Sequence, residues 1–173
     1  MKPLVGVELK RFLRDYRRAH PPRRELAFLL HSVEYPYNVG AIFRLADGAG
    51  VSQIVLSGIT PTPPNPTIEK VGRFKWRAVP WRYEKDALIA ARRLQAEGFE
   101  LIALELAEGA RPYFIYPYAQ KCCLIVGHED HGVTKALLAA ADAAVFVPMY
   151  GKGRSHNVAA ALAIVAYYAL HAP

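Results

Sequence analysis

The chain has 173 residues, with 22 lysine and arginine side chains against 15 aspartate and glutamate side chains, a formal net charge of +7. This length is most simply one domain whose core needs neither disulfides nor a structural metal. The longest apolar run, Val158 to Leu170, is too short to cross a bilayer, and basic residues interrupt any secretory signal near the start. We therefore expect a cytoplasmic protein without a membrane partner.

The only two cysteines, Cys122 and Cys123, are adjacent within a strand-like run. A disulfide between neighbours would be strained, and a thiolate metal site would lack further thiols. Both side chains are expected in the core.

Basic residues are concentrated at the amino terminus. Residues 1–24 hold eight basic and two acidic side chains, a net +6, so residues 25–173 contribute only +1. We therefore divide the chain into a basic arm over residues 1–24 and one domain over residues 25–173. The arm could bind a polyanion, above all nucleic acid, or it could be the solvated face of an ordinary helix, and the pattern leaves both open. Its candidate RNA contacts are Arg11, Arg14, Arg17 and Arg18.

Short apolar runs alternate with helical segments after the arm. The expected strands cover residues 26–30, 53–56, 99–106, 121–126 and 144–147, and the expected helices cover residues 38–46, 84–97, 134–141 and 158–170. This alternation predicts an α/β fold, in which a parallel sheet is flanked by helices and ligands bind at the carboxyl ends of the strands.

Basic and aromatic side chains alternate after a proline-rich loop. With a period of two, Phe74 and Trp76 would face inward from a half-buried strand, while Arg73, Lys75 and Arg77 would face outward. The same run suits RNA, since cations bind phosphates and rings stack on bases. The two interpretations are compatible, because an outward row of cations can follow a phosphate backbone.

Three polar turns follow expected strands. They are Asn38-x-Gly40-x-x-x-Arg44, Gly127-x-Glu129-x-x-Gly132-Val133 and Val147-Pro148-Met149-x-Gly151-x-x-x-Ser155-x-Asn157-Val158. In the third turn, Gly151 and Gly153 permit backbone angles that other residues avoid, which predicts a tightly folded loop. Ser155 and Asn157 can cap the helix that follows.

The second turn also contains four potential metal ligands, His128, Glu129, Asp130 and His131. Consecutive ligands on one loop rarely close a tetrahedron, and the HExxH spacing is missing. We therefore expect no metal. The glycine that opens this turn would instead let a flat group such as adenine approach the backbone.

Taken together, the three turns resemble the ordered motifs of the SpoU/TrmH family of RNA 2′-O-methyltransferases. The resemblance covers roughly residue 25 to the end of the chain. It implies a SPOUT-like fold with a C-terminal trefoil knot, S-adenosylmethionine as cofactor, tRNA or rRNA as substrate, and a homodimer. The chain departs from the usual pattern at His156 and Ala159, and Arg154 adds a cation beside the site.

The resemblance also implies roles for particular residues. The cofactor would be held by Leu104, Gly127, Val147, Met149 and Ser155. The polar centre of the active site would consist of Asn38, Arg44, Glu129, Ser155 and Asn157. The alternative is an RNA-binding protein that keeps the fold but does not methylate, since fold does not guarantee function.

Overall fold

The structure is a computed structural model that describes residues 1–173. Its strands are β1 (Glu25–His31), β2 (Gln53–Ser57), β3 (Trp81–Glu84), β4 (Glu100–Leu104), β5 (Arg111–Pro112), β6 (Lys121–Val126) and β7 (Ala143–Phe146). Its α-helices are α1 (Gly6–Ala19), α2 (Pro36–Ala49), α3 (Pro66–Gly72), α4 (Ala87–Ala96), α5 (Lys135–Ala140) and α6 (Val158–His171), and two 3₁₀ turns are η1 (Lys75–Arg77) and η2 (Tyr113–Ile115).

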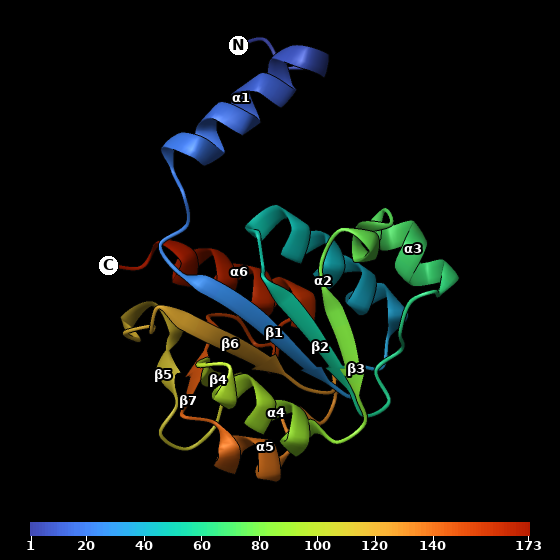
Figure 1. Cartoon of the computed structure of the whole chain (residues 1–173). Helices are drawn as coiled ribbons and strands as arrows, with labels where there is room; N and C mark the ends of the chain where they lie inside the picture. Colours follow the sequence, from blue (N-terminus) through green and yellow to red (C-terminus); the bar gives the residue numbers. More distant parts are fainter.

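The strands form one parallel sheet in the order β3-β2-β1-β6-β4-β7-β5. Helices α2, α3 and α6 lie over one face, and α4 and α5 lie over the other (Figure 1). The predicted α/β class is therefore confirmed. Strand β5, only two residues long, was missing from the prediction because two residues carry no periodicity.

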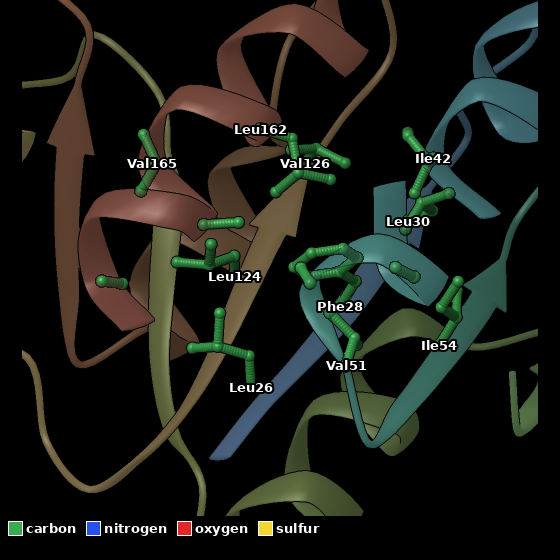
Figure 2. Close-up of a cluster of buried hydrophobic side chains, with 14 of the residues drawn as sticks. Leu26, Phe28, Leu30, Ile42, Val51, Ile54, Leu124, Val126, Leu162 and Val165 are labelled. Atoms are coloured by element: carbon green, nitrogen blue, oxygen red, sulfur yellow. The ribbon is translucent and has the colours of Figure 1, made fainter. Parts of the chain in front are cut away.

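Alternate residues of the central strands supply the two halves of the core. Leu26, Phe28 and Leu30 of β1 point toward α2 and α6 (Figure 2), whereas Ala27 and Leu29 point toward the α4 side. All five are fully buried or nearly so. Burying a leucine or phenylalanine contributes roughly 1.5–3 kcal/mol, so the sheet and its two helical layers account for most of the stability of the domain.

Helix α1 contributes nothing to this core. None of its residues is buried, and it projects away from the domain (Figure 1). Its arginines 11, 14 and 18 share one side of the helix by their spacing, and Leu9, Phe12 and Tyr16 share another. The helix is therefore an amphipathic arm outside the packed domain.

Arg24, at the base of this arm, belongs to the domain instead. Its side chain is buried, and its guanidinium donates hydrogen bonds to the carbonyl oxygens of Tyr118, Ala169, Ala172 and Pro173 at 2.6–3.2 Å. Three of these carbonyls lie at the end of α6, where helix carbonyls lack partners within the helix. Arg24 thus joins the start of β1 to the C-terminus of the chain.

The strand predicted around residues 73–77 is wrong. Arg73 and Phe74 have φ angles of 50° and 58°, which end α3 and are incompatible with an extended chain. The turn η1 follows, and extended structure begins only at Trp81. Phe74, expected inward, is 49% exposed, although Trp76 does pack against the core.

The chain crosses the carboxyl edge of the sheet between β7 and α6. Helix α5, just before β7, packs on the α4 side, whereas α6 packs on α2 and on strands β1 and β6 (Figure 1). Residues 147–157 make this crossing, and the candidate site lies along them. No helix of the chain has both the length and the apolar character that a membrane span requires.

Candidate active site

A cavity of about 710 Å³ lies at the carboxyl ends of β4, β6 and β7. Its apolar wall includes Leu104, Val126, Val147, Met149 and Val158. Its polar wall includes Glu105, Glu129, Arg154, Ser155 and His156. All five residues expected to hold a cofactor, Leu104, Gly127, Val147, Met149 and Ser155, therefore lie around one cavity.

A chain of side-chain hydrogen bonds joins the three polar turns. Asn38 donates from Nδ2 to Glu129 Oε1 at 2.7 Å, and Asn157 donates from Nδ2 to Asn38 Oδ1 at 2.9 Å. Asn38 is buried, Glu129 is half-buried and Asn157 is exposed, so both bonds are partly buried. Segments that are far apart in the sequence are thereby held in one arrangement.

Glu129 also accepts hydrogen bonds from the backbone at the start of α2. The N–H groups of Glu34 and Tyr35 donate to its two carboxylate oxygens at 2.9 and 3.2 Å. Partial burial raises the pKa of Glu129, but the hydrogen bonds from Asn38, Glu34 and Tyr35 together lower it more, so the net pKa lies below its ordinary value. Glu129 is therefore a carboxylate at neutral pH.

The predicted cap of α6 is half correct. Asn157 is the N-cap, and its Oδ1 accepts from the backbone N–H groups of Ala159 and Ala160 at 3.1 and 3.2 Å. Ser155 makes no such bond and is exposed at the rim of the cavity. Because Asn157 caps α6, the hydroxyl of Ser155 is free to contact a ligand.

The tightly folded glycine loop is not found. Neither Gly151 nor Gly153 has a positive φ, and a Cβ at Gly151 would meet nothing within 4 Å. Residues 150–157 are all exposed. The glycines here reflect an open loop, because no close backbone contact forces their conformation.

Gly127 is crowded by its own turn. A Cβ at this position would lie 2.0 Å from the carbonyl oxygen of Gly132, and His128 and Gly132 form an isolated bridge. The glycine is thus required by the closure of residues 127–132, with no need to invoke a flat ligand.

Glu105, which the sequence did not single out, fixes the other end of this turn. Its Oε2 accepts from Val133 N at 2.8 Å, and its carboxylate lies over Gly132, where a Cβ would approach it to 2.1 Å. An acidic residue directly after the apolar run of β4 was the available signal. Glu105 joins β4 to the turn after β6 inside the cavity.

The histidines of this turn are occupied by other contacts. His128 Nε2 lies 3.2 Å from the carboxylate of Glu34, and its Nδ1 accepts from Asp130 N at 3.1 Å. His131 lies beside it, with a ring-centroid distance of 4.6 Å. No group of three histidine, cysteine, aspartate or glutamate side chains is arranged to hold a metal ion.

Arg44 is exposed on α2 and makes no hydrogen bond or ion pair within the chain. Its helix is pinned in place, since Gly40 and Gly72 bring the backbones of α2 and α3 together. A Cβ at Gly72 would lie 2.9 Å from Gly40 O. Arg44 therefore presents an uncommitted guanidinium from a fixed helix.

The candidate RNA contacts lie in three places. The arginines 11, 14, 17 and 18 are exposed on α1, and Arg14 pairs with Asp15 at 2.9 Å. Arg73, Lys75 and Arg77 lie around η1, and Lys75 pairs with Asp47 of α2 at 2.7 Å. Arg154 is exposed at the cavity.

Proteins of known structure share this fold. The AdoMet-bound rRNA methyltransferase from Sinorhizobium meliloti is 30% identical with a TM-score of 0.79, over 88% of this chain and 58% of that chain. The TrmH/SpoU tRNA modifying enzyme of A. aeolicus gives a TM-score of 0.76 at 24% identity, over 94% of this chain and 82% of that one.

Similar sequences include enzymes of both tRNA and rRNA. The tRNA (guanosine(18)-2′-O)-methyltransferase of Thermus thermophilus is 33% identical over 98% of this chain and 84% of its own length. The 23S rRNA (guanosine(2553)-2′-O)-methyltransferase RlmP of Bacillus subtilis is 34% identical over 86% of this chain and 61% of its own length. The model of the SpoU rRNA Methylase family matches residues 25–167, so the chain belongs to this family.

Proposed function

We propose that the protein transfers a methyl group from S-adenosylmethionine to a ribose 2′-hydroxyl of tRNA or rRNA. The observation that carries this proposal is the hydrogen-bond chain from Glu129 through Asn38 to Asn157, which lies beside the cavity of about 710 Å³. The relatives act on 2′-hydroxyls of tRNA in one case and of rRNA in the other. Both substrates therefore remain within the proposal.

The residues around the cavity suit this cofactor. Leu104, Val147 and Met149 offer an apolar wall for a purine, and Glu105 and Glu129 offer carboxylates near which a cationic group is favoured. The cofactor, when bound, supplies a methyl group already activated by a sulfonium. The protein must then mainly align the 2′-oxygen with that methyl group and accept one proton.

The polar residues divide into two roles in this proposal. Asn38, Glu129 and Asn157 use their hydrogen-bonding groups on one another and on the backbone, so they position the turns. Arg44 and Ser155 are exposed and free to meet the ribose and its phosphate. Alignment of this kind can be worth about 7–11 kcal/mol, which is sufficient for catalysis without a metal.

We propose that residues 147–173 form a trefoil knot. The crossing of residues 147–157 to the opposite face of the sheet, followed by packing of α6 against β1, β6 and α2, supports this path. Knots are rare, because connections normally do not thread through loops. The Asn38–Asn157 bond would tie the threaded segment to α2.

We propose that the chain forms a homodimer through the uncovered side of α6. Ile164 and Tyr167 are one turn apart on this largely apolar helix and are 40% and 48% exposed. Ile164→Glu should therefore shift the sedimentation coefficient from that of a dimer to that of a monomer. An unchanged sedimentation coefficient would mean that the dimer interface lies elsewhere.

RNA would be bound by the exposed cations of α1 and by Arg154 at the cavity. Because α1 makes no core contact, its arginines can follow a phosphate backbone without disturbing the fold. The sign of the charge favours this assignment for α1, and the position of Arg154 at the cavity favours it for that residue as well.

Incubation with labelled S-adenosylmethionine and total RNA, followed by nucleoside analysis, tests the function. We expect label in a 2′-O-methylated nucleoside, and loss of that label with Arg44→Ala. Arg92→Ala is the matched control, because Arg92 is an exposed arginine of α4 on the other face of the sheet. Tight RNA binding without any transfer by the wild-type protein would instead favour the RNA-binding alternative.

A further inference from the structure

The segment Arg73–Arg77, which we name the spur, has an unfavourable local geometry. Two successive residues with side chains, Arg73 and Phe74, adopt left-handed φ angles. The spur also contains the buried Nε1 of Trp76, which finds no hydrogen-bond partner. Such departures persist where the surrounding structure imposes them, and they are concentrated at functional sites.

The result of this geometry is an exposed ring beside a fixed cation. Phe74 is 49% exposed, while the guanidinium of Arg77 lies 4.9 Å from the centroid of its ring. The same guanidinium lies 5.2 Å from the ring of Trp76. Arg77 is thus held by two aromatic rings and has no carboxylate partner.

The spur is attached to α2, the helix that carries Asn38 and Arg44. Lys75 pairs with Asp47 at 2.7 Å, and Gly72, just before the spur, contacts Gly40 through the backbone. Asp47 lies three residues after Arg44, so the two side chains are neighbours on the surface of α2. Anything bound to the spur is therefore held at a fixed distance from Arg44.

We infer that the spur binds an unpaired nucleotide of the RNA, with the base stacked on Phe74 and phosphates on Arg73 and Arg77. Residues 66–83 carry five cations against one carboxylate. Lys75 and Arg82 are paired with carboxylates of other segments, whereas Arg73 and Arg77 have no such partner and can complement RNA. A base presents a flat face to a ring only when it is not already stacked in a duplex, so the spur selects single-stranded RNA. The inference rests on RNA being the substrate and concerns how the RNA is held.

Binding of short RNA oligonucleotides tests the spur without any methyl transfer. The probes are a single strand of about 12 nucleotides containing 2-aminopurine and the blunt duplex of the same sequence. Phe74→Ala should weaken binding of the single strand about tenfold, leave the duplex unchanged and abolish the quenching of 2-aminopurine. Phe74→Trp should restore both affinity and quenching, because a larger ring still stacks.

The salt dependence of RNA binding separates the contribution of charge from the contribution of stacking. Phe74→Ala removes no charge, so the slope of log affinity against log salt should stay the same. Arg77→Gln should reduce that slope by about 0.7. Phe114→Ala is the matched control, because Phe114 is 43% exposed but follows β5 at the opposite edge of the sheet.

Two outcomes would overturn the inference. Phe74→Ala could bind the single strand as tightly as the wild type, or it could convert a dimer into a monomer, which would make the spur a protein interface. The wild-type protein could methylate no RNA while Phe74→Ala still loses single-strand binding and quenching. In that case the proposed function is wrong, but the inference about the spur is upheld.

Discussion

Asn38 and Glu129 are joined by a 2.7 Å hydrogen bond, although they are 91 positions apart in the sequence. Asn38 also accepts from Asn157 through the other atom of its amide. One side chain therefore links the start of α2, the turn after β6 and the start of α6. A substitution of Asn38, Glu129 or Asn157 should therefore alter the contacts of the other two.

Energetic coupling between Asn38 and Asn157 is the first prediction. Because each alanine substitution removes the same hydrogen bond, Asn38→Ala and Asn157→Ala should be non-additive in the free energy of unfolding, by roughly 0.5–3 kcal/mol. Urea unfolding of the two single variants and the double variant measures this. Asn65→Ala, which removes the cap of α3 elsewhere, should be additive with Asn157→Ala.

The pH dependence of Glu129 is the second prediction. Since its pKa in the folded protein is lowered, the ionised carboxylate stabilises the fold above its ordinary pKa, and this stabilisation is lost as the pH falls through the folded pKa. Glu129→Gln should therefore be less stable than the wild type at neutral pH, with the difference shrinking in acid. Urea unfolding across this range measures the difference.

A constant difference between the Glu129→Gln variant and the wild type at every pH would contradict this account. Glu108→Gln is the control, because Glu108 is exposed and makes no ion pair or hydrogen bond. Its unfolding curve should match that of the wild type at both ends of the range.

Closure of the turn at Gly127 is the third prediction. Gly127→Val would drive a side chain into the carbonyl oxygen of Gly132, so the turn must open and the cavity must change shape. Calorimetric binding of S-adenosylhomocysteine should be lost, whereas Gly151→Ala, which meets open space, should bind normally. Unchanged affinity in Gly127→Val would remove this turn from the cofactor site.

The sequence predicts best where one local signal decides the structure. Residues 122–126 are all apolar and end in the β-branched Ile125 and Val126, and β6 has the predicted bounds Lys121–Val126. The predicted helix after Pro36 was too short, because a proline can occupy the first turn of a helix and Pro36 does. It was also too short at its other end, because the helix runs on to Ala49 and is capped by Gly50, which has the left-handed conformation that favours glycine.

Prediction from the sequence fails where tertiary contacts determine the local structure. The alternation around Phe74 fits a strand, but the ion pair of Lys75 with Asp47 and the packing of Trp76 hold a compact turn. Arg24 was counted with the basic arm of residues 1–24, because no local pattern shows that its guanidinium donates to four distant carbonyl oxygens. The cavity residues were found because their motifs resemble a family, whereas Glu105 lies outside the motifs and was missed.

The different roles of Arg24 and the arm are the fourth prediction. Arg24→Ala leaves buried carbonyls without donors and should cost roughly 3 kcal/mol in the free energy of unfolding. Deleting residues 1–20 removes no buried side chain, so stability should stay within about 0.5 kcal/mol of the wild type.

For RNA binding the order of the two effects should be reversed: the deletion of residues 1–20 should matter more than Arg24→Ala. The deletion removes exposed cations, so the affinity for RNA and its salt dependence should fall while cofactor affinity is unchanged. An unchanged salt slope after the deletion would contradict RNA binding by α1 and make it a structural helix.

The role of Arg44 is the fifth prediction. A guanidinium stays protonated in proteins, so it is poorly suited to act as the base that accepts the proton of the 2′-hydroxyl. Exposed and uncommitted on α2, Arg44 can instead hold the adjacent phosphate and stabilise the 2′-oxygen as negative charge develops. Electrostatic stabilisation of this kind is worth roughly 3–4 kcal/mol in other enzymes. Arg44→Ala should therefore lose nearly all methyl transfer, while Arg44→Lys, which keeps the charge, should retain a measurable rate.

Single-turnover rates against pH distinguish the two roles of Arg44. An electrostatic role predicts the same pH profile for the wild type and for Arg44→Lys, because residue 44 then supplies a positive charge in both and takes no proton from the substrate. A base predicts a shifted profile in Arg44→Lys, since the ammonium loses its proton at lower pH than the guanidinium. Affinity for S-adenosylhomocysteine should barely change in either variant, because Arg44 lies outside the residues that line the cavity. A shifted profile together with unchanged cofactor affinity would assign Arg44 as the base and overturn the electrostatic role.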